Sequence, residues 1–191
     1  STGPDATLAG TPPVTSLNTA TPGNGDIFVN EAVSWTASSS PTTLTLNAAR
    51  DVNVNAAVTA VDGSFVVCCG RDINVNAPIT TTRGSVLLSA GRNLNQNAAI
   101  TVTDGNLMMC AANDVSINAA LTLTRGTSDP TRSLGLPLGL TLSADTDGTG
   151  PGITGGTAIF SPLAPLATVT GTNAPGNIYY NPISYTAPKD D

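Results

Sequence analysis

The acidic residues are the first candidates for chemistry, because paired carboxylates carry out general acid–base catalysis. Asp51, Asp72 and Asp114 recur at a regular interval, and Asn93 stands where a fourth aspartate would fall. A catalytic pair occupies one unique place in a chain, whereas these residues repeat. We therefore expect a structural corner motif here and not an active site.

A second acidic pair, Asp145 and Asp147, lies in a glycine-rich stretch that suits weak calcium binding. The stretch has neither the EF-hand spacing nor the RTX-type nonapeptide. The chain contains no histidine, so a nucleophile triad has no evident base. We expect a protein that is not an enzyme and that uses no cofactor and no catalytic metal.

The three cysteines are candidates for disulfide or metal chemistry. Cys69 falls in a predicted inward column with Ala48, Ala90 and Ala111, which indicates a small buried side chain. Cys68 and Cys110 fall in an outward column, two turns of the predicted fold apart. That separation is roughly 9.6 Å at the usual strand spacing, beyond the roughly 7 Å limit for a disulfide. Without histidine or a CxxC pair a zinc site is poor, so both thiols are candidates for bonds between molecules.

Threonines form the largest regular set of polar side chains. They follow a Thr-x-Thr pattern that recurs three times, and we call them the threonine face: Thr80, Thr82, Thr101, Thr103, Thr122 and Thr124. A flat double column of hydroxyls could order water or bind a ligand, as in ice-binding β-solenoids. Threonine is also an ordinary β-branched choice for an exposed strand, and both interpretations stay open.

These residues are positioned by a repeat of 21 residues that closes at Gly63, Gly84, Gly105 and Gly126. The four copies align without a gap: TLTLNAARDVNVNAAVTAVDG, SFVVCCGRDINVNAPITTTRG, SVLLSAGRNLNQNAAITVTDG and NLMMCAANDVSINAALTLTRG. A fixed period of this length, rich in β-branched residues, is typical of a solenoid in which each repeat is one turn of chain.

Within a repeat, alternation with a period of two predicts which side chains point inward. The predicted inward columns are Leu44, Phe65, Val86, Leu107; Leu46, Val67, Leu88, Met109; Val52, Ile73, Leu94, Val115; Val54, Val75, Gln96, Ile117; Val58, Ile79, Ile100, Leu121; and Ala60, Thr81, Val102, Leu123. Three short strands per turn follow. We predict an all-β, right-handed parallel β-helix with coils stacked at roughly 4.8 Å and negligible helix.

An uninterrupted column of asparagines should mark one bend: Asn55, Asn76, Asn97 and Asn118. Stacked amides can bond to their copies above and below, which predicts a structural ladder. Gln96 is the one amide in an apolar column and needs a partner if it is buried. On the outer side Val66, Leu87 and Met108 form an apolar column, which indicates either a covering loop or a lateral contact.

Three regions are expected. Residues 1–24 are an extended leader or N-terminal cap, residues 25–126 are regular coils, and residues 127–191 are irregular coils with loop insertions and a C-terminal cap rich in tyrosine and proline. The first coil is about four residues longer than the others, with the excess expected at 38–41. Leu140–Asp145 restarts the repeat, and the last strand candidates are 158–160, 167–170 and 177–180.

Composition excludes some classes of partner. The net charge is −6 and charged residues make up only 10% of the chain, so no basic stripe favours nucleic acid. No apolar run is long enough to span a membrane, and no signal sequence opens the chain at Ser1. We expect either that a leader has been removed or that the chain is an excised segment.

The wording of the repeats resembles the filamentous haemagglutinin-like exoproteins of two-partner secretion in Gram-negative bacteria. The resemblance lies in GRDINVNA at 70–77, AGRNL at 90–94 and NIYYNPISYTAP at 177–188. It implies a secreted or cell-surface protein, exported through an outer-membrane partner and built as a long right-handed β-helix. The 191 residues are far fewer than such exoproteins contain, and we expect no secretion domain among them.

We therefore predict a non-enzymatic structural shaft of an extracellular bacterial adhesin or fibre, which is either a fragment or a small subunit that stacks end to end. The expected partners are other copies of the chain or adjacent repeats of a longer exoprotein, with host or matrix glycans or proteins as further ligands. Two alternatives remain: an ice- or ligand-binding solenoid that uses the threonine face, and a glycan-active β-helix enzyme.

Overall fold

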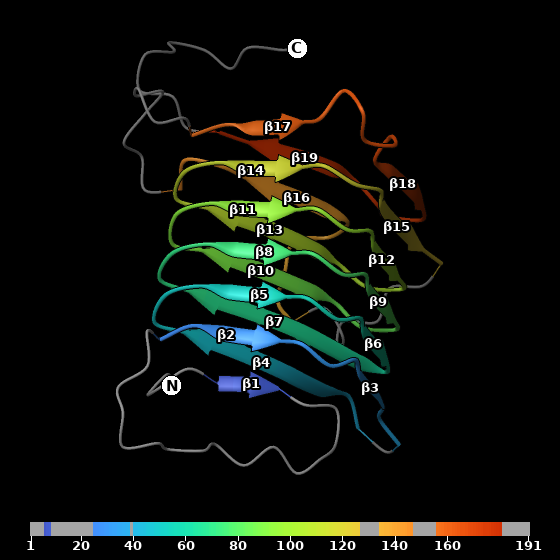
Figure 1. Cartoon of the computed structure of the whole chain (residues 1–191). Helices are drawn as coiled ribbons and strands as arrows, with labels where there is room; N and C mark the ends of the chain where they lie inside the picture. The colour runs from blue at the N-terminus through green and yellow to red at the C-terminus, as the bar shows by residue number, and fades with distance from the viewer. Residues whose placement is uncertain (1–5, 9–24, 39, 127–133, 147–155, 181–191) are drawn as a thin grey trace.

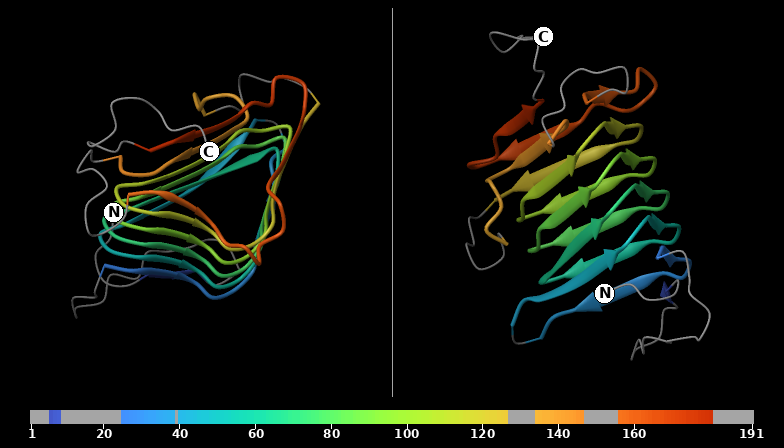
Figure 2. Two further views of the ribbon diagram at one scale, coloured as in Figure 1. Left: turned by 90° about the horizontal axis from the view of Figure 1, so that it is seen from above. Right: turned by 90° about the vertical axis from the view of Figure 1, so that its left-hand side faces the viewer.

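The chain folds as a right-handed parallel β-solenoid, which confirms the predicted fold class (Figures 1 and 2). The computed structural model describes residues 6–8, 25–38, 40–126, 134–146 and 156–180, and these contain strands and no helix. Each coil contributes one strand to each of three parallel sheets. Seen along its axis the solenoid has three walls, as Figure 2 shows.

Sheet A has seven strands and the other two sheets have six each. In spatial order, sheet A contains β1 (Ala6–Leu8), β2 (Ile27–Val29), β5 (Val52–Val54), β8 (Ile73–Val75), β11 (Leu94–Gln96), β14 (Val115–Ile117) and β17 (Ala158–Phe160). Sheet B contains β3 (Val33–Thr36), β6 (Val58–Val61), β9 (Ile79–Thr82), β12 (Ile100–Thr103), β15 (Leu121–Arg125) and β18 (Thr168–Gly171). Sheet C contains β4 (Thr42–Ala48), β7 (Gly63–Cys69), β10 (Val86–Ala90), β13 (Leu107–Ala111), β16 (Leu140–Ser143) and β19 (Gly176–Tyr179).

Equivalent positions of successive repeats lie directly above one another. Ile73 pairs with Leu94, and Leu94 pairs with Val115, so the register follows the sequence repeat without a slip. All predicted inward columns are buried except at Leu44 and at Cys69, which are half-buried, so the predicted burial of Cys69 is only partial. Leu44 belongs to β4, the first strand of sheet C, where no described strand lies below it.

Gln96 is fully buried in its apolar column, and the backbone supplies its partners. Its amide nitrogen donates to the carbonyl oxygens of Ala98 at 2.8 Å and Ala120 at 3.0 Å. Its amide oxygen accepts a long hydrogen bond of 3.5 Å from the N–H of Ala119. The side chain thus bridges two coils at the bend after sheet A, which explains why an amide is tolerated inside the core.

One bend of each coil depends on close contact between glycines. Asp62, Arg83 and Asp104 adopt left-handed φ angles of 54°, 51° and 52°, and each is followed by the closing glycine of a repeat. A Cβ atom on Gly84 would lie 1.9 Å from the carbonyl oxygen of Gly63. The glycines are therefore required by the stacking distance between coils, while the turn itself is made by the residue before them.

The first and last coils carry the insertions. Five residues, 37–41, separate β3 from β4, whereas Asp62 alone separates β6 from β7, which confirms the longer first coil. Leu107 pairs with Leu140, as the restart of the repeat predicts, and the three last strand candidates correspond to β17, β18 and β19. β1 pairs in parallel with β2, extending sheet A by one strand. Pro182, Tyr185 and Pro188 lie outside the described residues, so the C-terminal cap stays a prediction.

Candidate functional site

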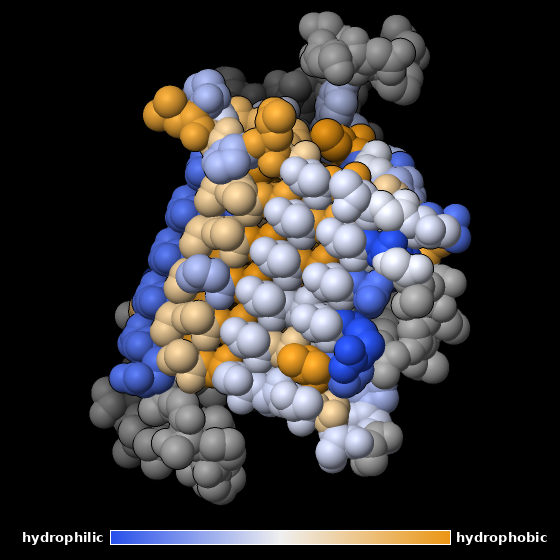
Figure 3. All heavy atoms as spheres, turned by 90° about the vertical axis from the view of Figure 1, so that its right-hand side faces the viewer, coloured by the Kyte–Doolittle hydropathy of each residue, from blue (hydrophilic) through white to orange (hydrophobic). Residues whose placement is uncertain are grey.

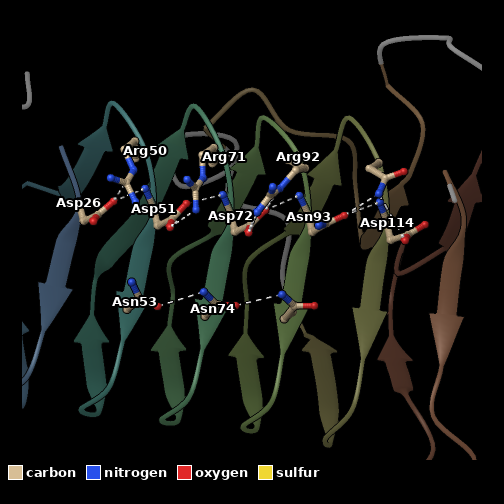
Figure 4. A network of polar contacts seen from close by, with 12 residues as sticks. Asp26, Arg50, Asp51, Asn53, Arg71, Asp72, Asn74, Arg92, Asn93 and Asp114 are labelled. Carbon is tan, nitrogen blue, oxygen red and sulfur yellow. Dashed lines mark hydrogen bonds and ion pairs between the residues drawn. The ribbon is translucent and has the colours of Figure 1, made fainter. Parts of the chain in front are cut away.

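The repeated aspartates form a ladder at the bend that precedes sheet A (Figure 4). The side-chain oxygen of each residue accepts the backbone N–H of its equivalent in the next coil. The acceptors Asp26, Asp51, Asp72 and Asn93 do so at 3.0, 3.1, 3.1 and 3.4 Å. Asp114 continues the ladder by accepting the N–H groups of Gly156 at 2.7 Å and Thr157 at 3.1 Å.

Arginine side chains pair with three of these carboxylates. Arg71 pairs with Asp51 at 2.9 Å, Arg50 approaches Asp26 at 3.5 Å, and Arg92 forms a two-point contact with Asp72. The hydrogen bond from the Arg92 side chain is the main reason why the pKa of Asp72 lies below its ordinary value, against the opposing effect of burial. Such carboxylates are engaged in holding neighbouring coils together and are poor candidates for proton transfer.

Amide side chains form two further ladders. In the predicted asparagine column each side chain donates to the one in the preceding coil, at 2.9 to 3.0 Å, and the ladder begins at Asn30: Asn30, Asn55, Asn76, Asn97 and Asn118. A second ladder, not anticipated from the sequence, runs along the outer face of sheet A through Asn53, Asn74 and Asn95 at 3.0 and 2.9 Å. The alternation of asparagine with inward valine or isoleucine was the pattern that could have revealed it.

The glycine bend carries a fourth set of hydrogen bonds between coils, which was not predicted from the sequence. Ser64 Oγ accepts the N–H of Ser85 at 3.1 Å, and Ser85 Oγ accepts the N–H of Asn106 at 3.0 Å. Asn106 Oδ1 in turn accepts the N–H of Gly139 at 3.0 Å. These three side chains are buried. The sequence contained the pattern, because a polar residue follows Gly63, Gly84 and Gly105.

The threonine face lies on the outer side of sheet B, where its members pair in register from β9 through β12 to β15. Thr59 on β6 and Thr168 and Thr170 on β18 extend it, and Val61 interrupts one column. Thr124 is exposed and the other five of the six residues are half-buried. Figure 3 shows the result as two pale columns rising side by side on this face. The outward positions of this sheet carry no charged residue.

One of the two outward cysteines is less exposed than expected. Cys68 is half-exposed, but Cys110 is buried and donates to the carbonyl oxygen of Leu88 at 3.6 Å, so its expected exposure is wrong. Thr141, next to Met108 on the same outer face, is buried too, which indicates that other parts of the chain cover this stretch. Burial raises the pKa of the Cys110 thiol and lowers its reactivity.

The register of sheet C places the three cysteines and the apolar outer column relative to one another. Ser89 lies between Cys68 and Cys110 in register, so the two cysteines are two coils apart and all described cysteines are free thiols. Cys69 is half-buried beside Ala48 and Ala90, and burial raises the pKa of its thiol. The predicted apolar outer column, Val66, Leu87 and Met108, is half-buried.

The predicted calcium position is described only in part. Asp145 is buried, with its backbone N–H donating to the carbonyl oxygen of Asn113 at 3.0 Å, while Asp147 lies outside the described residues. Among the described residues no group of three or more cysteine or acidic side chains is placed to hold a metal ion. The described residues also contain no helix that is long and apolar enough to cross a membrane.

These features place the protein in the class of parallel β-solenoids, with polar side chains that connect neighbouring coils. No family model, no curated protein and no solved structure matches the chain.

Proposed function

We propose that this chain is a non-enzymatic structural shaft of a secreted or cell-surface bacterial adhesin or extracellular fibre. The observation that supports it is that polar side chains at all three bends are engaged in bonds between coils. The aspartate, asparagine and serine columns each run parallel to the axis and connect successive turns. An enzyme concentrates polar groups at one place, whereas a shaft distributes them evenly along its length.

The resemblance to filamentous haemagglutinin-like exoproteins supports the extracellular location, and so does the low content of charged residues with short polar ladders in their place. In this role the solenoid supplies reach, rigidity and a repeated contact surface. Its partners would be adjacent coils of the same kind, together with host or matrix glycans or proteins that contact the outer faces.

Immunogold labelling of the cells that produce the protein tests this proposal. We expect label on the cell surface or in extracellular material, and none on cells from which the gene has been deleted. Label confined to the cell interior would overturn the proposed role, whatever the shape of the purified protein.

A second candidate function is the binding of ordered water or ice by the threonine face. The regularity of the face favours it, because threonine hydroxyls and methyl groups repeat in two directions, at about 4.8 Å along the axis. β-Branched side chains have few rotamers, so such an array is held in place before a ligand arrives.

Thermal hysteresis and ice-crystal shape separate the two candidates. An ice-binding protein should show both effects, and replacing Thr101 and Thr122 with tyrosine should abolish them by disrupting the middle of the array. A shaft should tolerate the same double substitution, because both side chains point away from the core. Absence of hysteresis and of crystal shaping in the unmodified protein would eliminate the ice-binding function.

A further inference from the structure

The C-terminal end of the solenoid presents three strand edges that have no neighbour among the described residues. β17, β18 and β19 are the last strands of sheets A, B and C, just as β1, β3 and β4 are the first. Each of these strands pairs with a described strand on one side only. The backbone N–H and C=O groups of the other side form a template for a further parallel strand.

Side chains that belong to the core lie open at this end. Phe160 is in register with Ile117, and Ile178 is in register with Leu142, so both occupy inward columns. They are nevertheless 45% and 51% exposed, whereas Ile117 and Leu142 are buried because another coil lies above them. The last coil thus presents the same kind of surface that every lower coil presents to the next one.

The described strands at this end carry no charged side chain that would oppose edge-to-edge association. Residues 156–180 include no aspartate, glutamate, lysine or arginine, although charges are a common means of blocking a free edge. The connection between β17 and β18 adds two exposed apolar side chains, Leu163 at 94% and Leu166 at 90%. An uncharged apolar end of this kind favours contact with another β-structure.

We propose that this end binds the N-terminal end of a second copy of the chain, with β1 of one copy added in parallel to the free edge of β17 in the next. This inference rests on the proposed structural role. β1 and β17 are the two outermost strands of sheet A, and both run parallel to all their neighbours. A second copy displaced along the axis therefore continues the sheet in the same direction, and the contact repeats without closing.

Several arguments identify a second copy as the occupant. In sheet A the contact continues one that the chain already contains several times, namely the parallel pairing of one strand with its equivalent in the next coil. Ala6 pairs with Ile27 at the spacing of one coil, so β1 already lies where a strand of a preceding coil would lie. A second copy matches the strand direction, the strand spacing and the sheet position together.

Electron microscopy and sedimentation at increasing protein concentration test the proposal on the full chain. We expect thin unbranched fibres with an axial repeat of about 34 Å, which corresponds to the seven strands of sheet A at the usual spacing. A chain that remains a folded monomer at high concentration would overturn the proposal.

Two neighbouring residues of β17 supply a matched pair of variants. Phe160 points toward the axis and Ile159 points outward, in register with Ser116, although their exposures of 45% and 42% are similar. Phe160→Lys should raise the concentration needed for assembly at least about tenfold, because it places a charge between stacked coils. Ile159→Lys should leave it unchanged. The reverse result would indicate lateral association and overturn the proposal.

A mixing experiment tests both ends at once. A chain without residues 1–24 lacks β1 but keeps the upper edge, whereas Phe160→Lys keeps β1 and blocks the upper edge. Each should remain monomeric alone with unchanged circular dichroism, and a mixture should form dimers and nothing longer. Failure to form dimers would overturn head-to-tail stacking while leaving the structural role intact, since immunogold labelling tests that role separately.

Discussion

Gln96 shows how a single polar residue can be accommodated between coils. Its amide donates to two backbone carbonyls, and no apolar side chain can replace that contact. We expect Gln96→Met, which keeps the unbranched shape, to lower the free energy of unfolding by about 2 kcal/mol, because two carbonyl acceptors of half-buried residues lose a donor.

Ile117→Met in the same inward column is the matched control, and we expect it to cost less than about 1.5 kcal/mol. Urea unfolding of both variants gives the comparison. A Gln96→Met protein as stable as the unmodified chain would show that the amide contributes nothing net to folding.

Asp72 contributes to stability in two ways that can be separated. Its side-chain oxygen accepts a backbone N–H, and its charge pairs with Arg92. Asp72→Asn keeps an oxygen that can accept the N–H of Asn93, as Asn93 itself does for Asp114. We expect this substitution to change the free energy of unfolding little at neutral pH, since the Arg92 partner is exposed. Asp72→Ala removes the acceptor and should cost about 1 kcal/mol more. Chemical denaturation at pH 7 measures both.

The pH dependence of Asp72 follows from the direction of its pKa shift. The folded protein holds the pKa below the ordinary value, so the carboxylate stabilises the fold above about pH 4 and this contribution is lost as the pH falls through the folded pKa. Unfolding curves between pH 7 and pH 2 should show a shallower acid loss for Asp72→Asn. An identical loss of stability in both proteins would show that protonation of Asp72 does not contribute to it.

Side-chain roles were predictable from the sequence where a column repeats without exception and less so elsewhere. The asparagine column indicated a ladder because the same amide recurs at the same bend. The burial of Cys110 was not predictable, because period-two alternation distinguishes inner from outer faces but does not say which outer stretch another segment covers. The partners of Gln96 could not be named either, because they are backbone carbonyls of a neighbouring coil.

At the scale of the strand and bend, the closing glycines allow neighbouring coils to approach closely. A Cβ atom on Gly84 would overlap the carbonyl oxygen of Gly63, whereas on Gly126 it would meet only the side-chain oxygen of Asp104, at 3.3 Å. Gly84→Ala should therefore lower the free energy of unfolding by about 3 kcal/mol.

Gly126→Ala is the control and should change stability by no more than about 0.5 kcal/mol, since a side-chain oxygen can move aside. Thermal unfolding of the two variants gives the comparison. Equal tolerance at both positions would mean that the coils separate readily at this bend and that the glycine contact is unimportant.

The strands were predictable because two short-range rules act together. Alternating side chains set the inner and outer faces, and glycine at a fixed interval sets the turns, so every strand between residues 42 and 126 falls where the repeat places it. After Gly126 the insertions displace the repeat, and only short apolar runs such as 158–160 remain as guides. Which sheet each late strand joins depends on long-range pairing that the local pattern does not contain.

At the scale of the whole molecule, stability should be a sum over coils and their contacts, because each coil touches only its neighbours. Removing one complete coil, residues 85–105, places Asn106 directly after Gly84 in the position that Ser85 held. β7, β8 and β9 would then meet β13, β14 and β15 in register. We expect a folded protein whose denaturant m-value is smaller by roughly a tenth, in proportion to the surface lost.

A deletion of half a coil, residues 85–95, is the decisive control. It would place the next residues on a different sheet and reverse the inner and outer faces, because a shift by one position exchanges the two sides of a strand. The shorter deletion should therefore lose more stability than the longer one, as circular dichroism and urea unfolding would show. If stability followed only the number of residues removed, the chain would not be held together by the alignment of equivalent positions in stacked coils.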